Sequence, residues 1–120
     1  MAKTALVADD TEFHRSFIKL FLTTKGYAVT IATDGLEALE ACKKGTFDIV
    51  FSDIEMPNMN GVEFLRAVKR LPGFDKVPVV ILSTLTDPAM MQKMANLGAF
   101  HYMVKPFNNE KMDLLFAKLH

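Results

Sequence analysis

The chain has 120 residues, with 14 lysines and arginines balancing 14 aspartates and glutamates, and 50% of the residues are hydrophobic. This is the size of one globular domain, and zero net charge gives no electrostatic reason to bind nucleic acid, so we expect a single domain over residues 1–120 and no nucleic-acid partner. The single cysteine cannot form an intrachain disulfide, no signal-peptide hydrophobic region is visible, and no apolar run approaches the ~20 residues that cross a bilayer, which predicts a cytoplasmic protein with no membrane partner.

Short apolar runs alternate along the chain with longer segments of helical periodicity, the order of elements typical of a βαβα fold. Several runs are apolar on both faces, as strands of a parallel sheet covered on both sides require. The expected strands are residues 4–8, 27–32, 48–52, 77–82 and 100–104.

A helix is expected after each of these strands. The first should turn an apolar stripe toward the sheet before it stops at Gly26, with members at helical spacing: Phe13, Phe17, Leu20 and Phe21. The middle helices are expected over residues 36–44, 62–71 and 88–97, the last of them capped by Asp87. The final helix follows a cap at Asn108 or Asn109 and again has apolar residues at helical spacing.

Five strands alternating with five helices predict a (βα)5 domain whose parallel sheet lies between two helical layers. Right-handed crossovers leave few topologies for such a chain. We favour the α/β flavodoxin-like fold with strand order 2-1-3-4-5. In open sheets of this kind, ligands bind beyond the carboxyl ends of the strands, so the residues at the strand exits are the informative ones.

Polar residues follow four of the five expected strands: Asp9 and Asp10, then Asp53, then Ser83 with Thr84, and finally Lys105. Strands 1 and 3 are neighbours in the expected order, so the three aspartates should converge in one cleft. Alone, the first aspartate pair would serve equally well as a helix cap. Three converging carboxylates repel one another, and an oxygen-only site of this kind suits Mg²⁺ better than a metal that prefers histidine or cysteine.

Asp53 is the candidate nucleophile of this cleft. The flexible side chain of Lys105 is long enough to reach back toward it across two strands, and Ser83 lies between them. A carboxylate beside a divalent cation, a hydroxyl and an ammonium suits phosphoryl transfer, because the cations neutralise the phosphoryl oxygens while the carboxylate attacks in line. Two other reactive side chains have structural interpretations: His14 is expected at the surface of the first helix, and Cys42 is expected to pack on the second.

Nearly the whole chain resembles the receiver domain of two-component response regulators, of the single-domain chemotaxis (CheY-like) type. The resemblance rests on LVADD at residues 6–10, SDIEMPNMNG at 52–61, VILS at 80–83 and YMVKPF at 102–107. It implies that Asp53 accepts a phosphoryl group from a phosphohistidine of a sensor histidine kinase, or from acetyl phosphate. It further implies that Mg²⁺ is held by Asp10, Asp53 and the backbone carbonyl of Glu55, with Asp9 acting directly or through water.

The resemblance also assigns roles to residues after the last two strands. Ser83 and Lys105 would bind the phosphoryl oxygens, and the Lys105–Pro106 peptide bond would be cis. Signalling would follow when Ser83 moves toward the phosphoryl group and Tyr102 turns inward, with Thr84 standing where a smaller residue is usual. Such a protein is a signalling protein, which catalyses only its own phosphoryl transfer and autodephosphorylation.

The output surface is predicted from the methionines of the helix that begins at Pro88. Met90 and Met91 point about 100° apart, so at least one of Met90, Met91 and Met94 should be exposed. Flexible thioethers suit an adaptable docking face, although methionines filling an irregular core are an equal alternative. We expect an output protein to bind the face formed by this helix, the fifth strand and the last helix, with a phosphatase as a further partner.

Three other functions compete with this interpretation. A phosphatase of the haloacid dehalogenase type would need a second aspartate at the position of Glu55, and a larger chain. A flavodoxin would need a first loop rich in Ser, Thr and Gly, where Asp9 and Asp10 would repel phosphate. A receiver that binds partners without phosphorylation is disfavoured because all five site residues are present.

Overall fold

The computed structural model describes residues 3–119, which form a single sheet of five parallel strands in the order β2-β1-β3-β4-β5. The expected α/β flavodoxin-like fold is therefore confirmed. In chain order the elements are β1 (Lys3–Ala8), α1 (Glu12–Thr24), β2 (Tyr27–Ala32), α2 (Gly35–Lys44), β3 (Ile49–Asp53), α3 (Gly61–Lys69), β4 (Val79–Ser83), α4 (Pro88–Asn96), β5 (His101–Val104) and α5 (Asn109–Leu119).

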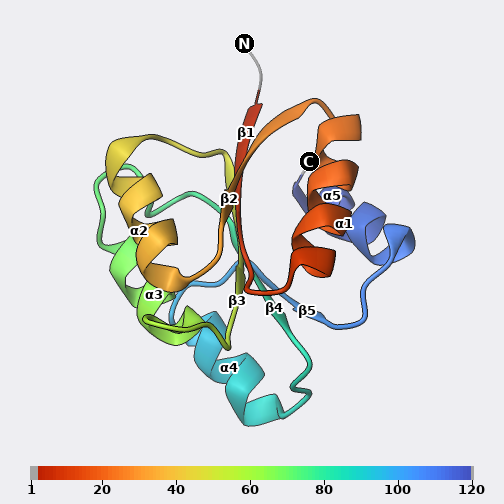
Figure 1. Cartoon of the computed structure of the whole chain (residues 1–120). Helices are drawn as coiled ribbons and strands as arrows, with labels where there is room; N and C mark the ends of the chain where they lie inside the picture. The colour runs from red at the N-terminus through yellow and green to blue at the C-terminus, as the bar shows by residue number, and fades with distance from the viewer. Residues whose placement is uncertain (1–2, 120) are drawn as a thin grey trace.

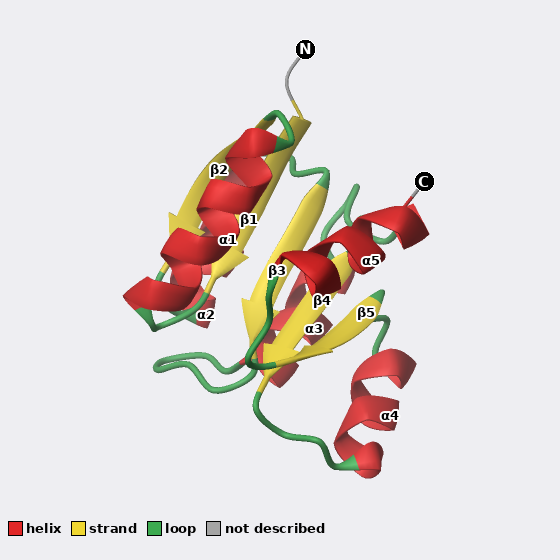
Figure 2. Ribbon diagram, turned by 90° about the vertical axis from the view of Figure 1, so that its right-hand side faces the viewer, coloured by secondary structure: helices red, strands yellow, loops and turns green. Residues whose placement is uncertain are grey.

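Helices cover both faces of the sheet and create two hydrophobic cores. Figure 1 shows α1 and α5 on one side of the strands and α2, α3 and α4 on the other, and in Figure 2 the first pair lies in front of the sheet. Leu6 of β1 packs with Phe64 and Met94 in one core, whereas its neighbour Val7 packs with Ile18 and Met112 in the other. Both faces of the central strands must therefore be apolar, which explains their continuous hydrophobic runs.

β2 has the expected bounds, whereas one or both ends of the other strands differ by one or two residues from those expected. Pro78 has no N–H to donate, so β4 begins at Val79 rather than at residue 77. At their other ends, β3 and β4 each continue one residue further than expected and include Asp53 and Ser83. Both polar residues thus belong to the hydrogen-bonded sheet, which holds them more rigidly than a loop would.

The orientation of α1 corrects the expected apolar stripe. Phe13 and Leu20 are 75% and 68% exposed, while the buried residues of this helix are Ile18, Phe21 and Leu22. At about 100° per residue, Phe13 and Leu20 lie more than a quarter turn from Ile18, so one helix cannot bury both sets. The sheet covers the face with Ile18, Phe21 and Leu22, and Phe17 packs against the same core, whereas Phe13 and Leu20 remain in solvent. The expected stripe is therefore right for Phe17 and Phe21 and wrong for Phe13 and Leu20.

Short polar side chains cap the N-termini of several helices, although Thr11 at the start of α1 makes no side-chain cap hydrogen bond. The carboxylate of Asp87 accepts a hydrogen bond from the Ala89 N–H at 3.0 Å, as expected for the cap of α4. Of the two expected caps of α5, Asn108 accepts from the Lys111 N–H at 2.9 Å. The longest helix, α1, has 13 residues. Among residues 3–119, none of the helices has the length and apolarity needed to span a bilayer.

Candidate phosphoryl-transfer site

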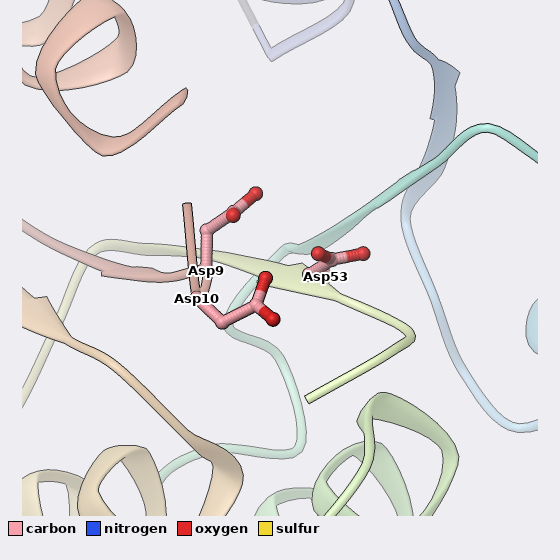
Figure 3. A group of neighbouring side chains, drawn as sticks. All are labelled: Asp9, Asp10 and Asp53. Atoms are coloured by element: carbon pink, nitrogen blue, oxygen red, sulfur yellow. The ribbon is translucent and has the colours of Figure 1, made fainter. Parts of the chain in front are cut away.

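The parallel register brings the predicted aspartates together at the carboxyl edge of the sheet. Ala8 pairs with Ser52 between β1 and β3, so the residues that follow, Asp9 and Asp53, are neighbours. Together with Asp10 they each place one carboxylate oxygen within 4.8 Å of the others. Figure 3 shows Asp9 and Asp10 in consecutive positions after β1, with Asp53 facing them from the end of β3. Asp9 and Asp53 are buried, whereas Asp10 is exposed.

Backbone groups of the surrounding turns fix the two buried carboxylates. The Ile54 N–H donates to Oδ1 of Asp53 at 2.8 Å, and the Thr11 N–H donates to Oδ1 of Asp9 at the same distance. α3 approaches this edge so closely that a Cβ on Gly61 would clash with the carbonyl oxygen of Asp53. Glycine is therefore required where α3 begins.

Lys105 supplies the positive charge of the site. Its Nζ lies 3.0 Å from Oδ2 of Asp9 and 3.1 Å from Oδ2 of Asp53, and its side chain is only 7% exposed. The lysine reaches this position because its backbone N–H donates to the Ser83 carbonyl at 2.7 Å, directly after β5. The peptide bond that joins Lys105 to Pro106 is cis.

The charges of the site do not balance among the residues described. Three carboxylates face one ammonium, and burial raises the pKa of Asp53, with Asp9 raising it further against the opposing effect of Lys105. The exposed carboxylate of Asp10 leaves the cluster open to solvent on one side. An oxygen-only donor set with excess negative charge fits a hard divalent cation such as Mg²⁺.

A pocket of about 230 Å³ beside the cluster is lined by most of the residues that the sequence predicts for the site. Its lining includes the predicted residues Asp10, Asp53, Glu55, Ser83, Thr84 and Lys105. Ser83 is buried at the end of β4, and its hydroxyl oxygen accepts from the Leu85 N–H at 3.0 Å, which ties this side chain to the loop that follows.

Tyr102 lies outside this pocket but is tied to the same loop. Its hydroxyl donates to the Leu85 carbonyl at 2.9 Å, and its side chain is half-buried. The loop that follows Ser83 at the end of β4 therefore has a direct hydrogen bond to β5. This connection joins the pocket to the surface beside α4.

Two residues near the cluster were not predicted as part of it. His14 lines the pocket rather than the outer surface, with Nδ1 at 3.4 Å from Oδ2 of Asp9 and its ring against Phe107. The guanidinium of Arg15 donates to the Asp9 carbonyl at 2.8 Å. Both residues lie in the first turns of α1, which follow directly on the aspartate pair, and that short spacing was the available signal. Cys42, in contrast, is buried on α2 as expected.

Residues 5–116 match the sequence model of the family described as Response regulator receiver domain. The chain belongs to this family. A receiver of similar length, the chemotaxis protein CheY of Thermotoga maritima, is 34% identical over 113 residues that cover 93% of this chain and 92% of the relative. Other relatives are longer than this chain. The probable transcriptional regulator ycf29 of Porphyra purpurea is 34% identical over 95% of this chain, which spans 54% of that relative. The transcriptional regulatory protein ZraR of Klebsiella oxytoca is 32% identical over 94% of this chain, which spans 25% of that relative.

Solved structures agree with the CheY-like type of receiver. Chemotaxis response regulator CheY4 of Vibrio cholerae matches with a TM-score of 0.92 and 34% identity, and the match covers 100% of both chains. The CheX–CheY–BeF₃–Mg²⁺ complex from Borrelia burgdorferi matches with a TM-score of 0.90 and 26% identity, over 98% of this chain and 88% of that one. The chain is therefore a response regulator receiver domain of the CheY-like type.

Proposed function

We propose that Asp53 is the phosphoacceptor of this receiver and that a sensor histidine kinase is the donor. A carboxylate oxygen of Asp53 forms the new bond to phosphorus while the bond from phosphorus to the donor imidazole breaks, and the imidazole nitrogen keeps the electron pair. The position of Asp53 carries this proposal. It is buried at a strand exit, with the Lys105 ammonium at 3.1 Å and two more carboxylates beside it.

The residues that would hold Mg²⁺ are Asp10, Asp53 and the backbone carbonyl of Glu55, with Asp9 acting directly or through water. When bound, the cation would offset the charge of the phosphoryl oxygens. Lys105 would donate to one of these oxygens, since its ammonium already lies beside the nucleophile. The hydroxyl of Ser83 would donate to another, after giving up its present contact with the Leu85 N–H.

Transfer would change the output surface through the loop after β4. Movement of Ser83 and Thr84 toward Asp53 would pull on the Leu85 carbonyl, which accepts the hydrogen bond from Tyr102. This tyrosine would then turn inward and alter the face formed by α4, β5 and α5. We propose that the output protein binds there. The expectation that at least one of the three methionines of α4 is exposed is not met, because Met94 is buried and Met90 and Met91 are half-buried.

The CheY relatives favour chemotaxis as the pathway, and the CheX complex supports a phosphatase as a further partner. Autodephosphorylation by water would return Asp53 to its starting state and would be the only other reaction of the chain. In this proposal residues 1–120 act as one cytoplasmic receiver domain that does not contact nucleic acid or membrane.

Phosphorylation at Asp53 can be measured by mass spectrometry after incubation with acetyl phosphate and Mg²⁺. One added phosphoryl group is expected for the parent chain and none for Asp53→Asn or for the parent in EDTA. Asp113→Asn, an exposed aspartate of α5, is the control and should be modified like the parent. If the parent takes up no phosphoryl group, the alternative of a receiver that binds partners without phosphorylation is favoured.

A further inference from the structure

One side chain outside the pocket holds the main chain on both sides of Lys105. The ammonium of Lys111 donates to the Val104 carbonyl at 3.0 Å and to the Pro106 carbonyl at 2.7 Å. These two carbonyls flank Lys105, whose own N–H donates to Ser83. Lys111 is itself fixed, because its backbone N–H donates to the Asn108 cap.

The place of Lys111 in its helix is electrostatically unfavourable unless its charge is used. It stands in the first turn of α5, where the helix dipole favours anions and disfavours cations. Its half-buried side chain turns back from the helix to the loop, where two carbonyl oxygens accept its protons. A hydrogen bond from a charged donor stabilises more than one from a neutral donor. The two hydrogen bonds of Lys111 to the loop therefore offset the unfavourable interaction of its charge with the helix dipole.

We propose that Lys111 is a positioning residue for Lys105, a role that rests on the proposed phosphoryl transfer. The stem of a lysine is flexible, so the place of its ammonium depends on where its main chain is anchored. Lys105 must keep its Nζ near 3 Å from both Asp9 and Asp53, and a shift of about 1 Å in a reacting geometry can cost orders of magnitude in rate. Lys111 prevents that shift by closing the loop between β5 and α5.

The matched comparison is between Lys111→Met and Lys118→Met, two lysines of the same helix. The ammonium of Lys118 contacts the His101 ring at 3.3 Å and, among the described residues, donates no hydrogen bond to the loop after β5, so Lys118→Met should behave like the parent. Lys111→Arg keeps the charge and the donors and should largely restore the parent behaviour. If Lys111→Met does not fold, Lys111→Gln replaces it, since glutamine keeps a donor without the charge.

Two measurements separate positioning from general damage. In metal-free protein, amide hydrogen exchange at Lys105 should become roughly tenfold faster in Lys111→Met, because two bonds that close the loop are lost. Phosphorylation by acetyl phosphate should slow roughly tenfold, while the Mg²⁺ affinity measured by NMR titration stays within about twofold, since no carboxylate has moved.

The proposal is overturned if Lys111→Met exchanges and reacts like Lys118→Met, or if Lys111→Arg is no better than Lys111→Met. It is equally overturned if the Mg²⁺ affinity of Lys111→Met falls as much as its phosphorylation rate, because the whole edge of the sheet would then be disordered. A parent protein that is never phosphorylated would refute the proposed function instead. The exchange rate at Lys105 would then decide the role of Lys111 alone.

Discussion

Replacing Asp53 with asparagine should stabilise the metal-free protein at neutral pH. Carboxylate oxygens of Asp9 and Asp10 lie within 4.8 Å of Asp53, and each such pair repels by about 3.5 kcal/mol at an effective dielectric constant near 20. The Lys105 ammonium at 3.1 Å attracts by about 5 kcal/mol on the same scale. Solvent weakens the repulsion between the exposed Asp10 and Asp53, whereas the burial of Asp53 adds a desolvation cost to its negative charge. We expect Asp53→Asn to raise the free energy of unfolding by about 1–2 kcal/mol.

The pH dependence of this gain has a definite sign. Burial, with a further contribution from Asp9, raises the pKa of Asp53 in the folded protein despite Lys105. The folded state therefore binds the Asp53 proton more tightly than the unfolded state, whose aspartate pKa is about 3.9. As the pH rises from the unfolded pKa to the folded pKa of Asp53, the free energy of unfolding of the parent falls. The advantage of Asp53→Asn should be complete above the folded pKa and should disappear toward about pH 4.

Urea unfolding followed by circular dichroism in EDTA tests both statements. Asp113→Asn is the control, because this exposed carboxylate lies 3.7 Å from Lys25 at the surface and should change stability by less than about 0.5 kcal/mol. Added Mg²⁺ should stabilise the parent more than Asp53→Asn, since only the folded parent has the full ligand set. The reasoning is refuted if Asp53→Asn is less stable than the parent in EDTA at neutral pH, or if its advantage does not change with pH.

Three other substitutions or reagents probe the same structure. Asp10→Asn should weaken Mg²⁺ binding about tenfold or more in calorimetry without lowering metal-free stability, and an unchanged affinity would contradict the ligand set. Gly61→Ala should lower the free energy of unfolding by about 1–3 kcal/mol because its Cβ meets the Asp53 carbonyl, whereas at Gly45 the nearest atom lies 4.0 Å away and Gly45→Ala should cost less than about 0.5 kcal/mol. Burial raises the pKa of Cys42 to about 12, so iodoacetamide should label the native thiol far more slowly than the urea-unfolded one, and equal rates would contradict that burial.

The fold could be predicted because its signals are local and repeated. Each strand is a short, mostly apolar run, and four of the five exits have a candidate site residue within one position of the strand end. The topology then places Asp9 beside Asp53 without any knowledge of side-chain contacts. The strand ends were less certain, because they depend on single residues such as Pro78, and on whether a polar side chain such as Ser83 remains in the ladder.

Other features could not be read from the sequence because they depend on a choice between equivalent packings. The helix α1 has more apolar residues than one face can bury, and only the sheet decides that Ile18 is buried while Phe13 is exposed. The short spacing between His14 and the aspartate pair indicates only that they are near each other, and the rotation of α1 decides that the His14 ring reaches Asp9. The hydrogen bonds of the Lys111 ammonium to the loop carbonyls likewise could not be predicted, since a lysine in a first helical turn has no obvious partner in the sequence.

The contacts of Lys105 join parts of the chain that are very distant in sequence. The lysine binds Asp9 across 96 positions and Asp53 across 52. No fragment that lacks β5 can assemble this cluster, and partial folding of the first three strands leaves the aspartates without their ammonium. Closing such long loops is slow, so the site should appear only in the last cooperative step of folding. A chain that can transfer the phosphoryl group should therefore already have β1, β3 and β5 in one sheet.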